Sequence, residues 1–337
     1  MKTILKKWKV ISFGLGPIGS AIAKLAFSRK DQLEIIGAVD PNPEFVGKDL
    51  SEVAGISEKT GIKISSNGRN YYHEADVVLH ATSSFLSTAE SQLLEICENG
   101  VDVVSTNEEL SYPWYSHKEI AARIDATAKQ KGVSVLATGV NPGFVMDALA
   151  ITLSGVCAKV SEIRATRILD ATKRRIPFQK KVGIGLTAAE FEENVQTGKF
   201  GHIGLPESIA MVCDSLGRRV DRIEQHISPK ITDIAISTDH FGIVSPGHVI
   251  GLIQDGEGFS GGRKVAQYHI EMYAGANDPY DEIELLGEPN IKLQIPGGTP
   301  GDIATTAIVV NSIPRAIEAQ PGLWTIKDLR PASSVLA

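Results

Sequence analysis

Val10-Ile11-Ser12-Phe13-Gly14-Leu15-Gly16-Pro17-Ile18-Gly19 is the stretch of this 337-residue sequence that decides its fold. An apolar run is followed by glycines at G-x-G-x-x-G spacing, and a helix is predicted over residues 20–28. At this spacing Gly14 permits a tight turn, Gly16 lets the backbone approach a pyrophosphate, and Gly19 lets the helix pack closely on its strand. The free N–H groups at the start of such a helix face the anion. The stretch therefore predicts a dinucleotide site formed by Gly14, Gly16, Pro17, Ile18 and Gly19.

A second apolar run, residues 33–39, ends at Asp40, about twenty residues after the last glycine of the motif. An acidic side chain at that distance takes the ribose hydroxyls of a dinucleotide, and it repels the 2′-phosphate of NADP. Pro41-Asn42-Pro43, which follows, offers no arginine for such a phosphate. NAD is therefore favoured, and NADP stays open because Lys48 or Arg69 can fold back toward the ribose.

The composition is typical of a two-domain enzyme. The hydrophobic content of 42% is ample for a core, and the net charge of −6 is spread without long runs of one sign. We therefore expect neither nucleic acid nor a membrane among the partners. Residues 1–9 lack the apolar core of a secretory signal, and no run reaches the length of a membrane span. The three cysteines, Cys97, Cys157 and Cys213, are odd in number and lack C-x-x-C spacing. This favours reduced thiols in a cytoplasmic protein.

Alternating apolar runs and helical stretches continue after Asp40. Strands are predicted at 75–81, 101–105 and 133–138, and helices at 87–99 and 118–131. This alternation predicts an α/β domain over residues 1–142, with about six strands in a Rossmann-type, doubly wound parallel sheet.

Residues 143–300 have a different pattern. Longer runs with β-type alternation predict strands at 160–169, 230–238, 244–253 and 264–273, with helices at 188–197 and 205–216. We expect an α+β substrate domain with a mixed or antiparallel sheet. Residues 301–337 include an apolar helix, 303–313. We expect Asp302 to cap this helix and Pro314 to disturb it. We also expect the helix to return to the first domain and pack there.

Ligands of an open parallel sheet lie beyond the carboxyl ends of its strands. After the strand at 75–81, Ala81, Thr82 and Ser83 are expected to line the nicotinamide ribose or the pyrophosphate; a loop ahead of a helix cap at Ser87 is the alternative. After the strand at 133–138, Asn141 can hold a carboxamide or a substrate group, although a domain crossover alone would explain the neighbouring Gly and Pro.

Asn107-Glu108-Glu109 follows the strand at 101–105, where nicotinamide and substrate should meet. Asn107 is expected to contact the cofactor. In an extended segment, consecutive side chains point to opposite sides, so we expect Glu108 to face the site as acid/base, with Glu109 as the fallback. The alternative is that the pair begins a helix, whose dipole the charges complement. We expect Phe144 and either Trp114 or Tyr112 to line a substrate pocket between the domains.

The second domain carries a basic cluster, which is usually a solvated face. If the substrate has a carboxylate, Arg167 is the first candidate to bind it, because a strand can fix a bidentate geometry. His202, at a Gly-rich helix entrance, is a further candidate for the substrate, with a structural role as the alternative. No histidine pair has metal-ligand spacing, so no metal site is expected. The cluster comprises Arg164, Arg167, Lys173, Arg174, Arg175, Lys180 and Lys181.

Taken together, these segments resemble the 2,4-diaminopentanoate dehydrogenase family, which includes native amine dehydrogenases and is distantly similar to dihydrodipicolinate reductases. The likeness spans nearly the whole chain, and its motifs are specific as a set and weak singly. It rests on Gly14-Leu15-Gly16-Pro17-Ile18-Gly19, Ala81-Thr82-Ser83-Ser84-Phe85, Glu108-Glu109-Leu110-Ser111-Tyr112-Pro113-Trp114, Asn141-Pro142-Gly143-Phe144 and the segment from Gly201 to Met211.

The resemblance implies NAD(P)-dependent oxidative deamination of an amine to a ketone and ammonia, the reverse reductive amination, and a homodimer. The family's acid/base glutamate corresponds to Glu108, with Glu109 as fallback. The sequence lacks the H-H-R-x-K-type segment of dihydrodipicolinate reductases, which argues against that activity.

The residue chemistry agrees with an amine substrate, because a carboxylate near the nicotinamide can hold an ammonium by charge and move its proton. Two alternatives stay open: a reductase of a hydroxy or semialdehyde substrate, and a non-catalytic NAD-binding sensor.

Overall fold

The computed structural model describes residues 7–172, 174–198 and 200–334 and divides the chain into two compact units. Unit 1 comprises Met1–Phe144 and Pro300–Ala337, and unit 2 comprises Val145–Thr299. Lys173 of the predicted basic cluster lies outside the described residues. No helix among the described residues is both long and apolar enough to cross a membrane.

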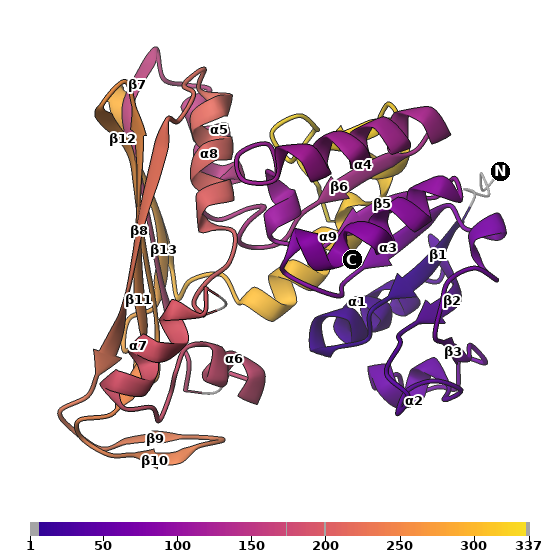
Figure 1. The fold of residues 1–337 in the computed structure, drawn as a ribbon, viewed down its shortest axis with the longest axis horizontal. Coiled ribbons are helices and arrows are strands. Elements are labelled where there is room, and N and C mark those ends of the chain that lie inside the picture. The colour runs from indigo at the N-terminus through magenta and orange to yellow at the C-terminus, as the bar shows by residue number, and fades with distance from the viewer. Residues whose placement is uncertain (1–6, 173, 199, 335–337) are drawn as a thin grey trace. The chain divides into compact units, whose positions relative to one another are not determined.

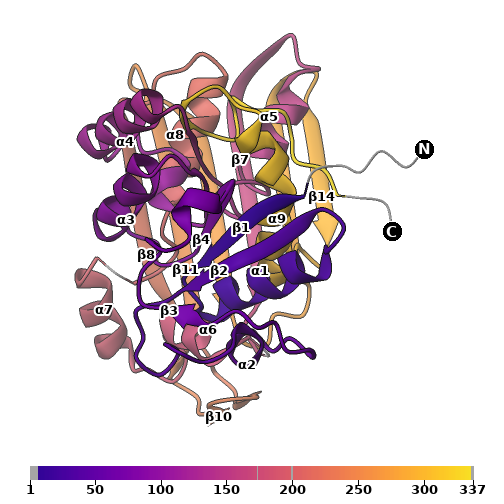
Figure 2. The same cartoon turned by 90° about the vertical axis from the view of Figure 1, so that its right-hand side faces the viewer.

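Unit 1 is built on a seven-stranded sheet with the order β15-β6-β5-β4-β1-β2-β3, of which Figure 1 labels β6, β5, β1, β2 and β3. Every strand pair in it is parallel, and Figure 2 shows β1 and β2 side by side. The predicted doubly wound parallel sheet is confirmed, and the strand order changes direction at β1, between β2 and β4. The strands are β1 (Trp8–Phe13), β2 (Leu33–Val39), β3 (Ile64–Ser65), β4 (Val77–His80), β5 (Asp102–Ser105), β6 (Ser134–Ala137) and β15 (Gly322–Trp324).

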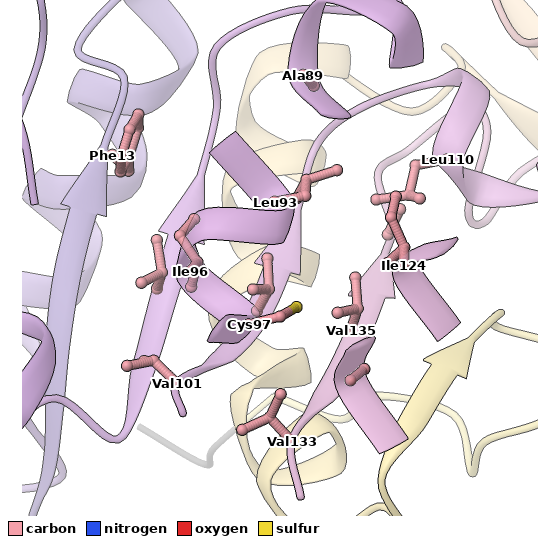
Figure 3. Close-up of a cluster of buried hydrophobic side chains, with 14 of the residues drawn as sticks. Phe13, Ala89, Leu93, Ile96, Cys97, Val101, Leu110, Ile124, Val133 and Val135 are labelled. Atoms are coloured by element: carbon pink, nitrogen blue, oxygen red, sulfur yellow. The ribbon is translucent and has the colours of Figure 1, made fainter. Parts of the chain in front are cut away.

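Helices cover both faces of this sheet, which is why its strands are nearly all apolar. One buried cluster joins the sheet to α3 and α4, with Leu93 and Ile124 fully buried in it (Figure 3). A second cluster joins the opposite face to α1 and α9, through Ile22 and Val309 among others. The helices are α1 (Pro17–Ser28), α2 (Leu50–Ala54), α3 (Leu86–Glu98), α4 (Lys118–Lys131) and α9 (Gly301–Ile317), with short 3₁₀ turns η1 (Tyr72–Glu74) and η2 (Glu109–Ser111).

Helix α9 differs from its prediction at both ends. Its N-cap residue is Pro300, whose side chain makes no capping hydrogen bond, and Asp302 lies within the first turn instead of capping it. The helix also continues through Pro314 to Ile317. It packs against α1, β4, β5 and β6, and so belongs to unit 1.

Unit 2 is built on a six-stranded sheet with the order β14-β13-β7-β12-β11-β8. Among the described strands of this sheet, only β7 and β12 pair in parallel, so the sheet is mixed, which is one of the two predicted forms. The strands are β7 (Lys159–Asp170), β8 (Arg222–Ile231), β11 (Val249–Ser260), β12 (Arg263–Tyr273), β13 (Tyr280–Glu288) and β14 (Ile291–Pro296).

Four helices and a two-stranded hairpin complete the described part of unit 2. Gly256 and Gly258 of β11 leave room for Leu205 and Ile209 of α8, because an added Cβ would lie 2.8 Å from Ile209 at either glycine. The elements are α5 (Ala148–Ser154), α6 (Ile176–Lys181), α7 (Ala188–Gln196), α8 (Leu205–Ser215), β9 (Ile236–Thr238) and β10 (Gly242–Val244).

Two strands predicted in this unit are wrong in their bounds. The run 230–238 is broken between β8 and β9, where the Thr232 hydroxyl donates to the Ile234 carbonyl at 2.7 Å and forms a turn. The run 244–253 is likewise divided between β10 and β11, with Gly247 at φ +83°. The Pro246-Gly247 pair in the second run is a turn signal that the prediction overlooked.

Candidate active site

The glycine-rich turn after β1 is shaped by two of its three glycines. Gly14 has φ +89°, and a Cβ there would lie 2.4 Å from the Ala81 carbonyl oxygen. A Cβ at Gly19 would lie 1.8 Å from the Gly14 carbonyl oxygen. At Gly16, by contrast, a Cβ would meet nothing within 4 Å. Packing within the chain therefore requires Gly14 and Gly19, whereas Gly16 leaves open space in front of the backbone.

That open space faces the start of α1. Gly16 is the N-cap and offers no side-chain cap, Pro17 occupies the first turn, and no acidic residue lies there. The positive end of the helix dipole is thus left to an external anion. Ile18 packs against the hydrophobic cluster behind the turn. The arrangement fits the pyrophosphate of a dinucleotide.

Asp40 lies beside the same turn. Its Oδ2 accepts a hydrogen bond from the Leu15 N–H at 2.7 Å, and its Oδ1 accepts one from the Asn42 N–H at 2.9 Å. These bonds fix the half-buried carboxylate at the end of β2, and its remaining lone pairs can accept from ribose hydroxyls. Arg69, considered above for a 2′-phosphate, instead lies with its Nε 3.6 Å from Glu95.

The loop after β4 uses its hydroxyls within the chain. Thr82 is exposed, and its Oγ1 donates to Gln92 Oε1 at 2.8 Å. Ser83 Oγ accepts from the Phe85 N–H at 3.1 Å, and the Ala81 N–H donates to the Phe13 carbonyl at 2.7 Å. The alternative with a helix cap at Ser87 is wrong, because α3 begins at Leu86.

The segment containing the two glutamates is not extended, so the alternation argument used to choose between them is wrong. Glu108 is helical, at φ −67° and ψ −42°, and the 3₁₀ turn η2 begins at Glu109. Glu109 Oε2 accepts from the Leu86 N–H at 2.6 Å and lies 3.1 Å from His117 Nε2. Its charge therefore stabilises the N-terminus of α3. Glu108 is half-buried, and its carbonyl accepts from the Ser111 hydroxyl at 2.6 Å.

Asn107 was predicted to contact the cofactor, but its side chain is buried and bonded within the protein. It is 1% exposed, its Nδ2 donates to the Ser83 carbonyl at 2.7 Å, and its Oδ1 accepts from the Leu110 N–H at 2.8 Å. The side chain therefore joins the loops after β4 and β5 and shapes the turn around Glu108.

The loop after β6 is tied to α9. The Val140 N–H donates to Thr305 Oγ1 at 3.2 Å, and Asn141 beside it is half-buried. Phe144 exposes 36% of its surface. The other aromatic candidates are less exposed than Phe144. Tyr112 is buried, and Trp114 packs against the hydrophobic cluster beneath α3 and α4.

The carboxyl ends of β1, β4, β5 and β6 are neighbours in one sheet, so unit 1 brings its predicted site segments to a single edge. No group of His, Cys, Asp or Glu among the described residues has the arrangement of a metal site.

In unit 2, Arg167 is not available to bind a substrate carboxylate in the predicted bidentate geometry. It is 2% exposed, its Nη1 lies 3.1 Å from Asp281 Oδ1, and its Nη2 donates to the Thr299 carbonyl at 2.8 Å. Asp281 Oδ2 accepts from the Thr299 N–H at 2.7 Å. The ion pair thus fastens the last residue of unit 2. Elsewhere in the basic cluster, Arg164 pairs with Glu162 on the same strand.

His202 is held by its backbone. Its N–H donates to Gln254 Oε1 at 2.8 Å, and its carbonyl accepts from Gln254 Nε2 at 3.1 Å. The ring Nε2 is buried, and no residue that the structure describes forms a hydrogen bond with it. Burial, together with the charges of Lys181 and Arg167, lowers the pKa of His202 to about 3, so the ring is neutral. A neutral ring nitrogen without a partner can hydrogen bond to a ligand.

Sequence reasoning missed His80, which ends β4 among the site segments. It is 1% exposed, with Nδ1 2.9 Å from Ser105 Oγ and Nε2 2.9 Å from Gln92 Oε1. Burial lowers the pKa of His80 to about 4. The available signal was one polar residue at the end of an otherwise apolar run.

Comparison with known proteins gives a consistent result over the whole chain. Residues 144–337 match the 2,4-diaminopentanoate dehydrogenase C-terminal domain, and residues 8–109 match the N-terminus of dihydrodipicolinate reductase. The chain is 35% identical to 2,4-diaminopentanoate dehydrogenase of Acetoanaerobium sticklandii over 96% of this chain and 94% of that one. It is 23% identical to an amine dehydrogenase of Streptomyces virginiae over 96% of each. Its fold is that of an amine dehydrogenase from Mycobacterium smegmatis, with a TM-score of 0.86, 24% identity and 98% of each chain covered.

Proposed function

Since the chain belongs to the 2,4-diaminopentanoate dehydrogenase family, we propose that it is an NAD(P)-dependent amine dehydrogenase. It converts a primary amine such as 2,4-diaminopentanoate, water and NAD(P)⁺ into the ketone, ammonium, NAD(P)H and a proton. In the reverse direction it aminates a ketone. The observation that carries the proposal is the 35% identity over nearly the full length of both chains, since it covers the nucleotide turn and unit 2 together.

The nucleotide is held by the turn of Gly14, Gly16, Pro17, Ile18 and Gly19, with Asp40 on the ribose. The open backbone at Gly16 and the uncapped start of α1 support this assignment. When bound, the nicotinamide supplies hydride chemistry. Asp40 supports a preference for NAD, because its fixed carboxylate would lie against a 2′-phosphate. We expect Asp40→Ser to raise kcat/KM with NADPH relative to NADH; an unchanged ratio would contradict the assignment.

Glu108 is the proposed acid/base, and Glu109 is not retained as the fallback. The support is that the carboxylate of Glu109 already accepts from Leu86 and contacts His117. Glu108 would hold the substrate ammonium by charge and take its proton before hydride leaves. After releasing that proton to solvent, it would activate the water that hydrolyses the iminium. Glu108→Gln is expected to abolish turnover while leaving NADH affinity unchanged. Retained turnover in this variant would refute the role.

Two further side chains stay in the proposal as substrate contacts. Phe144 supplies an apolar surface in unit 1, and its exposed ring supports this. In unit 2, the buried Nε2 of His202 would hydrogen bond to a polar group of the substrate. We expect His202→Ala to raise KM for a polar ketone more than for an unfunctionalised one, and equal effects would assign His202 to structure alone.

A homodimer is proposed through one face of the sheet in unit 2. Helices α5, α7 and α8 pack against this sheet (Figure 1). Tyr268 of β12 is on their side, because its hydroxyl donates to the carbonyl of Met146, which lies just before α5. His269, the next residue along β12, therefore lies on the opposite face, where it pairs with Asp255 at 2.7 Å and Glu271 at 3.1 Å. A second copy could pair with such alternating charges. Sedimentation equilibrium tests this, and a monomer at micromolar concentration would contradict it.

The free cysteines, Cys97, Cys157 and Cys213, support the proposal of a cytoplasmic location.

The reaction class is tested by oxidation of NADH and NADPH with 2-amino-4-oxopentanoate, 4-oxopentanoate and simple ketones, each with and without ammonium. Turnover that requires ammonium is the expected result. Turnover without ammonium would favour a reductase of hydroxy or semialdehyde compounds. Nucleotide binding without any turnover would favour an NAD-binding sensor.

A further inference from the structure

A buried chain of hydrogen bonds joins the ends of β4 and β5. His80 Nδ1 lies 2.9 Å from Ser105 Oγ, and Ser105 Oγ accepts from the Asn107 N–H at 3.0 Å. On its other side, His80 Nε2 lies 2.9 Å from Gln92 Oε1 and 3.0 Å from Thr82 Oγ1. His80, Ser105 and Asn107 are each at most 1% exposed, so water does not compete for the bonds among these three residues.

The chemistry of the partners fixes the direction of each bond. Gln92 Oε1 can only accept, and the Thr82 hydroxyl donates its proton to that same oxygen, so His80 Nε2 carries a proton and donates to Gln92 Oε1. His80 Nδ1 is then the acceptor, and Ser105 donates its hydroxyl proton to that nitrogen. Ser105 Oγ still has lone pairs to accept from the Asn107 N–H. The three residues thus form one consistent arrangement with a neutral imidazole, and the lowered pKa of His80 agrees with it.

The same residues hold the turn that carries Glu108. Asn107 Oδ1 accepts from the Leu110 N–H at 2.8 Å, which closes the turn around Glu108. Asn107 Nδ2 donates to the Ser83 carbonyl at 2.7 Å, and the Glu109 N–H donates to the Ser84 carbonyl at 3.3 Å. The backbone on both sides of Glu108 is therefore fastened to the loop after β4.

We propose that His80, Ser105 and Asn107 are positioning residues that set the place of Glu108 for proton transfer. This inference rests on the proposed function, in which Glu108 is the acid/base. A displacement of about 1 Å at a reacting group can cost about 10²-fold in rate. Loosening the network at Ser105, which ends β5, should therefore lower kcat and leave the nucleotide turn intact, because that turn packs on Ala81 in the loop after β4.

The test compares Ser105→Ala with Ser134→Ala as a matched control. Both serines are buried in neighbouring strands of one sheet, and each hydroxyl makes a buried hydrogen bond. Ser105 ends β5 at the site edge, whereas Ser134 begins β6 and donates to the Ala316 carbonyl at 2.6 Å. A purely structural role predicts the same loss of thermal stability and the same kcat in the two variants.

The positioning role predicts that kcat falls by about 10²-fold in Ser105→Ala alone. The NADH dissociation constant should stay unchanged in both variants, as measured by fluorescence titration. Equal kcat in the two variants, or a parallel loss of NADH affinity in Ser105→Ala, overturns the inference. Glu108→Gln separates the two levels: if that variant stays active, the catalytic role of Glu108 fails, and if it is inactive while Ser105→Ala has normal kcat, only the positioning role fails.

A second pair of variants keeps the inference testable if Ser105→Ala does not fold. The amide of His80→Asn ends near the position of Nδ1 and can accept from Ser105, whereas that of His80→Gln ends near the position of Nε2. The network predicts that the Asn variant retains more of kcat than the Gln variant, because only Asn keeps the bond toward Glu108. The reverse order would overturn it.

Discussion

Replacing two glycines of the same turn by alanine should separate nucleotide binding from folding. A Cβ at Gly16 meets nothing within 4 Å, and the backbone there, at φ −61° and ψ −178°, is accessible to alanine. Alanine reduces the entropy of the unfolded chain, which stabilises the folded protein by about 0.4–1 kcal/mol. It is also a poorer N-cap than glycine, which destabilises the helix by a similar amount. The free energy of unfolding of Gly16→Ala should therefore change by less than about 0.5 kcal/mol, because the two effects oppose each other.

Gly19→Ala should instead lower the free energy of unfolding. Its Cβ would lie 1.8 Å from the Gly14 carbonyl oxygen, so α1 must shift away from the turn. Overpacking of this kind costs about 1–3 kcal/mol. Gly16→Ala should instead weaken NADH at least about 10-fold, or about 1.4 kcal/mol, because its methyl group occupies the space in which the pyrophosphate lies.

Urea unfolding measures the stability of both variants, and fluorescence titration measures NADH affinity. Wild-type affinity in Gly16→Ala would refute the placement of the pyrophosphate above Gly16. Unchanged stability in Gly19→Ala would refute the close packing of α1 on the turn.

Three other predictions follow from buried or capping charges. Stability should fall as the pH drops from about 6.5 to about 4, because burial lowers the pKa of His80 from 6.5 to about 4 and only the unfolded chain takes up that proton; the site contributes about 3 kcal/mol. His80→Asn should make this limb shallower in urea unfolding at several pH values without removing it, because burial also lowers the pKa of His202. Arg167→Met should cost about 3–5 kcal/mol by the same measurement, because it leaves Asp281 buried without its cation, and a near-neutral result would mean that the pair contributes little. Glu109→Gln should lose about 0.3–1 kcal/mol at the start of α3 and keep its kcat, whereas an inactive Glu109→Gln would reassign the acid/base.

Sequence patterns predicted the longer strands and helices of unit 1, whose ends are marked by nearby residues. The strand at 33–39 and the helix at 118–131 have the predicted bounds, because an apolar run and a terminal glycine, Gly132 at φ +75°, mark their ends. About six strands were expected, and two of the seven observed, β3 and β15, have no counterpart among the predicted ranges. β3 and β15 contain two and three residues, which is too short for any periodicity, and parallel neighbours stabilise them.

The site was predicted as a set of loops more accurately than as a set of side chains. Strand ends locate the loops, but the conformation of the turn at Glu108 depends on the Asn107 contacts to Ser83 and Leu110. Arg167 was taken for a ligand fork because its partner, Asp281, lies on another strand and only tertiary structure pairs them. Sequence spacing contains no information about either contact.

The most direct test of the central claim is to identify the product formed from 2-amino-4-oxopentanoate, NADH and ¹⁵N-labelled ammonium. Mass spectrometry should find 2,4-diaminopentanoate with one ¹⁵N at the carbon that carried the ketone, formed in equal amount to the NADH consumed. An alcohol at that carbon, with no ¹⁵N incorporated, would show that the chain reduces carbonyls and would contradict its assignment as an amine dehydrogenase.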